Sequence, residues 1–283
     1  MKHYFDFDTP ISNCAVAFGR FDGMHIGHRA VLKKLSSYEN SVLLSFADNY
    51  SEIVYTEIEK EFVANSFEIK NMISLKSEIY ENMPLSDFVK NYLIEKLNTD
   101  TVVVGENYDR LDELEKVCAE NNVQVVKIPS VKKNEKKITT ELVKTCLKNG
   151  DMNECIDLLG KTYVVAGTVV HGKGVGRKYG MPTANLSFAS NKIWPKHGVY
   201  GTRVHLGDTV LRGMTNAGIR PSDDCNQVPT CETFILDFNG DIYDSLVILE
   251  AFTYVRPVMK FSGLEEVRAQ IDKDIEKISS FEI

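Results

Sequence analysis

The chain has 283 residues, of which 43% are hydrophobic and 26% are charged, the balance of a soluble globular protein. This balance excludes a disordered chain, a collagen-like repeat and a disulfide-dense secreted scaffold. No run approaches the roughly 18 apolar residues of a membrane span, and the first thirty residues lack the apolar core of a signal peptide. The six cysteines form no C-x-x-C pair, which favours unpaired thiols over a zinc site. We expect a cytoplasmic protein of two domains.

The net charge of -7 is unevenly distributed along the chain. Residues 1–159 hold 19 Lys and Arg against 26 Asp and Glu, whereas residues 160–283 hold 14 against 14. Such a chain is a poor candidate for general nucleic acid binding, which depends on neutralising phosphates. Residues 161–207, however, contain seven basic residues, no acidic residue and eight of the 18 glycines. Local positive charge with accessible backbone amides suits a small polyanion.

Residues 1–159 alternate between strand and helix patterns. We expect strands at 14–18, 42–46, 101–104 and 123–128 and helices at 26–35, 58–75, 85–97 and 111–120. This alternation predicts a mainly parallel sheet covered by helices, which binds its ligands beyond the carboxyl ends of the strands. A helical stretch over residues 138–159 leads out of this domain.

After Gly160 the pattern changes to β-rich runs separated by glycines and prolines. We expect strands at 163–170, 199–206, 209–214, 230–238 and 246–255. Five or six strands without intervening helices predict a small antiparallel barrel, and apolar residues at helical spacing predict a terminal helix over 263–278. The domains are therefore expected to be 1–159 and 160–283.

A first motif, G-R-F-D-G-M-H-I-G-H, directly follows the first expected strand. Phe21, Asp22 and Gly23 precede His25 and His28, which lie three residues apart and so share one helix face. Two imidazoles beside the free amides of a helix start suit charge on a transferring phosphate, and the motif predicts nucleotidyl transfer. Two surface histidines or a metal pair are the alternatives, but the strand, turn and helix context favours the nucleotide site.

A second motif, H-G-K-G-V-G-R-K-Y-G-M-P-T-A-N, follows a strand that ends at residue 170. Gly172 and the glycines after it let backbone amides approach a phosphate, while Lys173 and Arg177 add charge. Thr183 and Asn185 offer neutral oxygens two residues apart, which suit a Mg²⁺ that also takes phosphate oxygens. A flexible hairpin loop is the alternative, and P-T-A-N behind the glycines argues against it.

A third motif, C-E-T-F-I-L-D-F at residues 231–238, places Glu232 on a strand face with two apolar residues. Such a carboxylate is a candidate general base because partial burial raises its pKa; a charged residue at a barrel rim is the alternative. The run Y-V-R-P-V-M-K-F offers Arg256 and Phe261, a cation and a ring suited to a flat, electron-rich ligand. Taken alone, that run also fits a loop that packs on the terminal helix.

In these motifs and their order, the chain resembles the prokaryotic bifunctional riboflavin kinase/FAD synthetase family over essentially its whole length. The segments G-V-Y-G, N-A-G-I-R-P and R-P-x-x-K-F complete the match in the second half. The resemblance implies a six-stranded barrel that transfers the γ-phosphate of ATP to riboflavin to give FMN. It also implies a Rossmann-like nucleotidyltransferase domain that adenylylates FMN to FAD.

The resemblance implies roles for individual residues as well. Glu232 would be the base that takes the proton of the ribityl hydroxyl. The other implied residues are Gly172, Lys173 and Arg177 of the ATP loop, Thr183 and Asn185 at Mg²⁺ and the ATP phosphates, and Arg256 and Phe261 beside the flavin. In the first domain the implied nucleotidyltransferase residues are Phe21, Asp22, Gly23, His25 and His28.

Three segments of the first half depart from the family pattern. Where the family reads F-x-P-H-P and G-x-D-F-x-F-G, this chain has F-A-D-N-Y at 46–50 and G-E-N-Y-D-R-L at 105–111. Where it reads S-S-T-x-I-R, this chain has T-T-E-L-V-K at 139–144. Glu141 is then expected to repel a triphosphate, and Lys144 cannot copy the bidentate fork of an arginine. We therefore predict a competent kinase with weak or absent FMN adenylyltransferase activity.

Three other hypotheses remain open at the level of sequence. The chain could be fully bifunctional, a non-enzymatic flavin or nucleotide sensor, or a nucleic-acid-linked regulator that uses the basic stretch at 161–207. Glu232 argues against a sensor, because a pure binder has no use for a placed base. We expect riboflavin and ATP as partners, and neither nucleic acid nor membrane.

Overall fold

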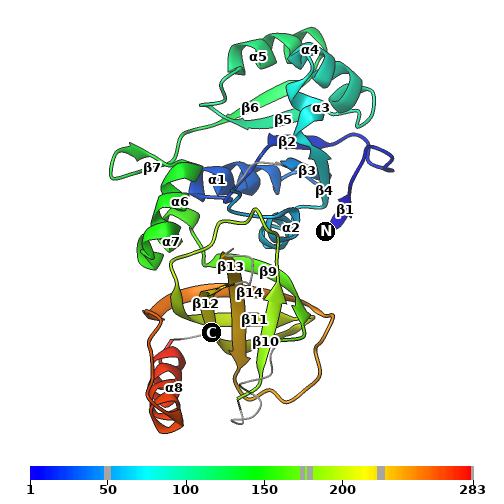
Figure 1. Ribbon diagram of the computed structural model, residues 1–283. Helices are drawn as coiled ribbons and strands as arrows, with labels where there is room; N and C mark the ends of the chain where they lie inside the picture. Colours follow the sequence, from blue (N-terminus) through cyan, green and yellow to red (C-terminus); the bar gives the residue numbers. More distant parts are fainter. Residues whose placement is uncertain (48–51, 173–175, 177–180, 222–226, 282–283) are drawn as a thin grey trace. The chain divides into compact units, whose positions relative to one another are not determined.

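The computed structural model describes residues 1–47, 52–172, 176, 181–221 and 227–281 (Figure 1). The chain forms two compact units, Met1–Thr140 and Glu141–Ile283. The helices α6 (Thr140–Asn149) and α7 (Met152–Leu159) lie at the start of the second unit, where α7 packs on the first and last strands of the β-rich part. The domain boundary expected between residues 159 and 160 stays a prediction.

The first unit is built on a six-stranded parallel sheet in the order β1–β4–β3–β2–β5–β6. Its strands are β1 (Lys2–Tyr4), β2 (Ala15–Gly19), β3 (Ser41–Ala47), β4 (Asn71–Lys76), β5 (Thr101–Gly105) and β6 (Gln124–Ile128). The central strands are almost wholly apolar because helices cover both faces of a parallel sheet. The expected Rossmann-like architecture is confirmed.

The helices of this unit are α1 (Ile26–Leu35), α2 (Glu57–Asn65), α3 (Ser77–Glu81), α4 (Leu85–Phe88) and α5 (Leu111–Glu120), with a π-helical turn at Val89–Ile94. Figure 1 shows them around the sheet. The chain passes from β2 through α1 to β3 on one side, and β5 lies on the other side of β2. The order of the strands therefore reverses between β2 and β5, which opens a crevice at their carboxyl ends.

The expected helix over residues 58–75 is wrong in its second half. A capping box starts α2, in which the Thr56 hydroxyl accepts a hydrogen bond from the Glu59 N–H and the Glu59 carboxylate accepts one from the Thr56 N–H. The helix ends at Asn65, and the apolar run after it forms β4 between β1 and β3. Short buried strands and buried helical segments share the same apolar pattern, so periodicity does not separate them.

The second unit is a closed antiparallel barrel in the order β10–β13–β12–β11–β14–β9. Its strands are β9 (Tyr163–Val170), β10 (Thr183–Ser187), β11 (Gly198–Leu206), β12 (Thr209–Pro221), β13 (Gln227–Ile235) and β14 (Leu246–Arg256). The terminal helix α8 (Leu264–Ser279) follows β14 and contacts β12 and β14. The expected six-stranded barrel with its helix is confirmed. Within the described residues, no helix is both long and apolar enough to cross a membrane.

Three buried threonines form a chain of hydroxyl groups inside the barrel. Thr215 lies between Thr202 and Thr233, and its Oγ1 atom is 2.9 Å from each of theirs. All three are at most 5% exposed. Because side chains alternate along a strand, the neighbouring Asn216 and Glu232 face the outside of the barrel. The threonine chain thus fixes which face of β12 and β13 is available to a ligand.

Replacing Thr215 by Val is expected to destabilise the second unit by about 1–3 kcal/mol, because Thr202 and Thr233 both lose a buried hydrogen-bond partner. Thr233→Val removes the hydroxyl bonded to Thr215 and to the Cys231 thiol but leaves the bond between Thr202 and Thr215, and is expected to cost about 1 kcal/mol. Urea unfolding of the two variants measures the difference. Equal midpoints for Thr215→Val and Thr233→Val would contradict a central role for Thr215.

Candidate active sites

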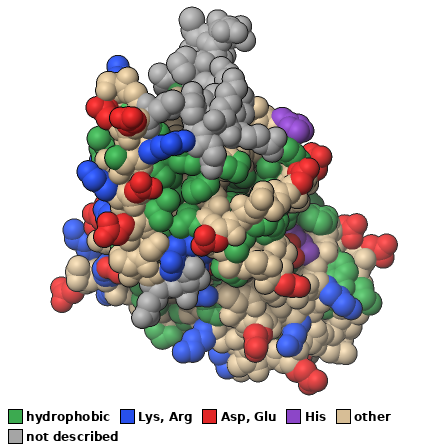
Figure 2. Space-filling model, turned by 90° about the horizontal axis from the view of Figure 1, so that it is seen from below, with side chains coloured by type: hydrophobic (Ala, Val, Ile, Leu, Met, Phe, Trp, Pro, Cys, Tyr) green, Lys and Arg blue, Asp and Glu red, His purple; other side chains and the backbone are tan. Residues whose placement is uncertain are grey.

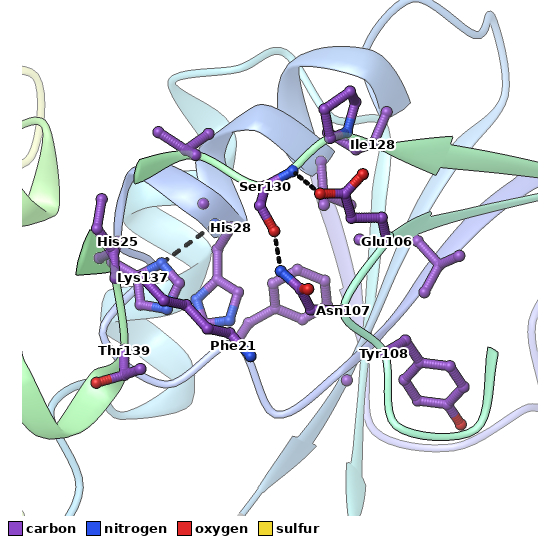
Figure 3. Close-up of a pocket in the computed structure, with 18 of the residues that line it drawn as sticks. Phe21, His25, His28, Glu106, Asn107, Tyr108, Ile128, Ser130, Lys137 and Thr139 are labelled. Carbon is purple, nitrogen blue, oxygen red and sulfur yellow. Dashed lines mark hydrogen bonds between the residues drawn. The ribbon is translucent and has the colours of Figure 1, made fainter. Parts of the chain in front are cut away.

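A cavity of about 360 Å³ lies in the first unit at the carboxyl ends of β2, β5 and β6 (Figure 3). It occupies the crevice where the order of the sheet reverses. The residues that line it come from four segments, namely 18–31, 103–108, 128–131 and 137–139. Strand ends, the start of α1 and the segment before α6 therefore converge on one cavity, as is typical of ligand sites in open α/β sheets.

His25 and His28 lie in the wall of this cavity with their rings stacked, 3.8 Å apart between centroids. His25 is the N-cap of α1, and its Nδ1 accepts a hydrogen bond from the His28 backbone N–H at 3.3 Å. The proton of a neutral His25 ring is therefore on Nε2. Burial lowers the pKa of His25 to about 4. Burial and then the charges of His25 and Lys60 lower the pKa of His28 well below its usual value.

The rest of the first motif builds the turn that leads to these histidines. Phe21 and Gly23 have φ values of +49° and +77°, and the Phe21 ring packs on His28 at 5.2 Å. The Asp22 carboxylate accepts hydrogen bonds from the backbone N–H groups of residues 54 and 55 at 2.8 and 2.9 Å. Asp22 and Gly23 are not among the residues that line the cavity, whereas Phe21 is. Asp22 therefore has a structural role, because its carboxylate fixes the turn before α1 to the backbone of residues 54 and 55.

The loop after β5, which departs from the family pattern, lines the cavity and is held by hydrogen bonds of its own. The Glu106 carboxylate accepts a bond from the Ser130 N–H at 2.8 Å, and the Asn107 amide donates to the Ser130 hydroxyl (Figure 3). Bonds from the backbone and side chain of Ser130, followed by the charge of Lys132, lower the pKa of Glu106. The carboxylate at this side of the cavity is therefore ionised near neutral pH.

The other two altered segments differ in their relation to the cavity. Thr139 lines it, but Glu141 does not: its side chain is 81% exposed and pairs with Lys144 at 3.2 Å. Phe46 is buried under the Tyr80 ring, with centroids 4.8 Å apart, and residues 48–50 lie outside the described residues. The Glu141 carboxylate, which was expected to repel a triphosphate, therefore does not lie in the wall of the cavity.

The His25 resonances are expected to titrate with a midpoint near pH 4 and to stay unchanged from about pH 5.5 to 8, because burial disfavours the charged ring. As the pH falls below 6.5, His25 binds a proton in the unfolded chain but stays neutral in the folded chain until the pH approaches 4. The free energy of unfolding therefore decreases between pH 6.5 and pH 4. NMR titration of the imidazole protons measures the midpoint. A midpoint near pH 6.5 would show that the His25 ring is exposed to water and would contradict its burial.

A second cavity, of about 210 Å³, lies on the outer face of the barrel between the strands and α8. Four residues that the sequence singles out line it together: Thr183 from β10, Glu232 from β13, and Arg256 and Phe261 from the end of β14 and the segment after it. Val267 and Ile271 close it from α8. Nearby apolar side chains are exposed, with Val258 at 58% and Met259 at 44%.

The barrel register aligns two polar residues of this cavity, Glu232 and Asn216, with Asn185, which lines neither this cavity nor the one adjoining it. Glu232 lies directly opposite Asn185 on β10 and opposite Asn216 on β12. Residues that face each other in this way have Cβ atoms about 5 Å apart and share one face. The row Asn185, Glu232 and Asn216 therefore crosses three neighbouring strands and presents two carboxamides beside one half-buried carboxylate.

Sequence reasoning missed the residues that hold Arg256. Its Nε donates to the Asp274 carboxylate at 2.8 Å, and its guanidinium lies over the Phe261 ring at 5.7 Å. Asp274 is 2% exposed and also accepts a bond from the Gln270 side chain. The sequence did carry a signal for this pair, because Asp274 is an acidic residue within the apolar stripe of the terminal helix. An acidic residue at such a buried position needs a cation as its partner.

Thr183 lies between this cavity and a third one of about 240 Å³, since it lines both. The third cavity is formed by the end of β9, the start of β10 and residues 238–243 after β13. The rings of His171 and Tyr243 pack at its edge with centroids 3.8 Å apart. Two ligands bound in adjoining cavities would meet at Thr183, as a group transfer requires.

The residues expected to hold a divalent cation fit that role. A Cβ at Gly172 would clash with the Asn185 side chain, so glycine at this position leaves room for the carboxamide beside the backbone. Asn185 and Thr183 supply neutral oxygens, and within the described residues no group of three or more His, Cys, Asp or Glu could hold a metal. Such a donor set suits Mg²⁺ that also takes phosphate oxygens. Lys173 and Arg177 lie outside the described residues.

Comparison with known proteins gives a consistent result for both units. Residues 159–281 match the family model described as riboflavin kinase, and residues 8–142 match the one described as FAD synthetase. Bifunctional riboflavin kinase/FMN adenylyltransferases of Listeria monocytogenes and Buchnera aphidicola are 28% and 29% identical to this chain. Each alignment covers 95% of this chain, and 92% and 94% of the respective relative.

A solved structure from Streptococcus pneumoniae, titled as a macrolide-efflux protein, is similar over 98% of this chain and 97% of its own. Its TM-score is 0.79 at 24% sequence identity. At that identity the likeness concerns the fold alone, and it supports the two-unit architecture.

Proposed function

Since the chain belongs to the bifunctional riboflavin kinase/FMN adenylyltransferase family and is a riboflavin kinase, we propose that its second unit makes FMN with the barrel residues described above, and that its first unit has weak or no adenylyltransferase activity. The family uses riboflavin, FMN, ATP and Mg²⁺. The observation that carries the kinase mechanism is the position of Thr183 between two cavities, one of which contains Glu232.

In the proposed reaction, riboflavin occupies the cavity under α8 and ATP the adjoining one. Glu232 accepts the proton of the terminal ribityl hydroxyl while that oxygen attacks the γ-phosphorus of ATP. The bond between the γ-phosphorus and the β–γ bridging oxygen breaks, and ADP leaves. Arg256 and Phe261 border the flavin ring system, where the Asp274 carboxylate keeps the guanidinium in place.

The ATP phosphates are proposed to lie along the start of β10. Gly172 would lie beside them, and Thr183 and Asn185 would hold Mg²⁺ through their side-chain oxygens. The ATP-binding roles of Lys173 and Arg177 stay expectations from the sequence. The bound ion supplies charge neutralisation on the phosphates. The close packing of Gly172 on Asn185 supports this arrangement, because it sets the carboxamide beside the backbone of the same loop.

The weak adenylyltransferase activity is the finer part of the proposal. The loss of one donor to a transition state typically costs on the order of 10²–10³ in rate, and the loop after β5 offers Asn107 and Tyr108 where the family pattern differs. One observation favours the second candidate, a fully bifunctional enzyme: His25 and His28 are neutral, stacked and face a cavity of about 360 Å³. The products decide between the two.

We also propose a cytoplasmic location and the small molecules riboflavin and ATP as partners, with neither nucleic acid nor membrane. The described cysteines, Cys14, Cys118, Cys146, Cys155 and Cys231, are all unpaired and buried, which suits a reducing compartment. ATP is available there at the concentrations that a kinase needs. A sensor that only binds flavin stays the alternative for the second unit.

Purified protein incubated with riboflavin, ATP and Mg²⁺ is expected to accumulate FMN with little or no FAD. Chromatographic separation of riboflavin, FMN and FAD measures both activities at once, and adding FMN instead of riboflavin isolates the second. Conversion of FMN to FAD at a rate comparable to FMN formation would establish the bifunctional enzyme. If neither FMN nor FAD forms, the result favours a protein that only senses flavin or nucleotide.

Glu232→Gln is expected to lower the kcat of FMN formation by about 10²–10⁴-fold, because the carboxamide has the shape of the carboxylate but accepts no proton. Riboflavin binding, followed by flavin fluorescence, is expected to stay near the wild-type value. Glu276→Gln, the same change on an exposed position of α8, is the matched control. Unchanged turnover in the Glu232 variant would exclude it as the base.

A further inference from the structure

A short hairpin beside the first-unit cavity contains four lysines. It consists of β7 (Lys132–Lys133) and β8 (Lys136–Lys137), in which Lys132 pairs with Lys137 and Lys133 with Lys136. The two turn residues, Asn134 and Glu135, have φ values of +49° and +62°, as a two-residue primed turn requires. This turn fixes the register, so each pair of lysines shares one face of the hairpin.

The two faces of the hairpin differ in their surroundings. Lys137 lines the first-unit cavity, and Figure 3 shows its side chain extending towards the side where His25 and His28 lie. Its cross-strand partner Lys132 acts electrostatically on Glu106, which lines the same cavity. Lys136, on the opposite face, is absent from the residues that line the cavity. Only one face of the hairpin therefore serves the cavity.

The two lysines of this face differ in how far their charges are compensated, because Lys132 lies near enough to act on the ionised Glu106 carboxylate. Among the described residues, Lys137 has no ion-pair partner within 4 Å, and the Glu106 carboxylate is drawn beside Ser130, away from Lys137 (Figure 3). Like charges directly opposite each other destabilise a strand pair, and a two-stranded hairpin is itself only marginally stable. A bound anion near the pair would relieve this repulsion.

We propose that Lys137, with Lys132 behind it, is the phosphate-binding element of the first-unit cavity and retains a nucleotide there independently of adenylyl transfer. The buried histidines carry no net charge, and Arg20, the other cation among the described residues that line the cavity, is paired with Glu81 at 2.6 Å, so Lys137 supplies the positive charge that a phosphate needs. The shared chemistry is a phosphate group carried on a ring system that fits the apolar part of the cavity, and either ATP or FMN carries one. The inference rests on the proposed function because it concerns the same cavity.

Hydrogen–deuterium exchange of the full chain separates this cavity from the barrel, because each unit gives its own peptides. The chain is titrated with a non-hydrolysable ATP analogue and Mg²⁺, with FMN, and with adenosine, while exchange is followed in a peptide that spans residues 19–28. Lys137→Gln is expected to raise the half-saturating concentration of a phosphate-bearing ligand roughly tenfold, and Lys132→Gln by less. Lys136→Gln, from the other face of the same hairpin, is the matched control and is expected to stay within about twofold.

Each ligand distinguishes one source of the phosphate. A Lys137-dependent shift with the ATP analogue assigns the phosphate to ATP, and the same shift with FMN assigns it to the flavin nucleotide; either supports the proposal. Adenosine lacks phosphate, and its titration is expected to be the same in the wild-type and Lys137→Gln chains. Three results would overturn the proposal: no protection of residues 19–28 by either phosphate ligand, an equal shift in Lys136→Gln, or an equal shift with adenosine.

The result is independent of the kinase reaction. If the wild-type chain makes no FMN, the proposed function fails, whereas a Lys137-dependent protection in the first unit still supports the phosphate-binding role. If FMN forms and residues 19–28 show no protection, the kinase stands and the inference is wrong.

Discussion

The barrel site depends on a constraint that lies beneath it, the chain of hydroxyl groups between Thr202, Thr215 and Thr233. These groups are buried and hydrogen-bonded to one another, so the strands that carry them cannot slip by one residue without exposing them and burying their polar neighbours. The row of Asn185, Glu232 and Asn216 on the outer face follows directly from that register. The hydrogen-bonded threonines inside the barrel therefore determine which polar side chains the outer face of β12 and β13 presents.

The candidate sites of the two units differ in their electrostatics. In the first unit, two buried and neutral histidines lie beside a helix start, and the cations among the described residues that line the cavity are Lys137 and Arg20, the latter paired with Glu81. In the second, a carboxylate lies beside neutral side-chain oxygens, and a basic glycine-rich stretch precedes them in the sequence. Figure 2 shows one face of the molecule, with hydrophobic side chains gathered in its middle and charged ones around them.

The fold was predictable because its strong signals are periodic. Strand and helix alternation predicted the parallel sheet, and β-rich runs after Gly160 predicted the barrel. The strand β4 was missed, since an apolar run next to a helix fits either structure. The cavity under α8 was predictable only in part: Thr183, Glu232, Arg256 and Phe261 stand out in the sequence, but their meeting depends on barrel closure. Asp274 and the lysine hairpin were missed because the sequence does not show which acidic residue packs against a given cation. Only the fold brings Asp274 to Arg256 and places Lys137 at the cavity.

The ion pair between Arg256 and Asp274 has a consequence for what the enzyme can distinguish. Asp274 is 2% exposed, so a guanidinium that turned away to contact a ligand would leave a buried carboxylate unpaired, at a cost of about 3–5 kcal/mol. Arg256 therefore presents a fixed flat surface beside Phe261. Recognition by a flat surface is governed by outline and by stacking, and less by the pattern of donors and acceptors at a ring edge. If this cavity holds the flavin as proposed, tricyclic compounds of similar outline would accordingly fit it as well as riboflavin does.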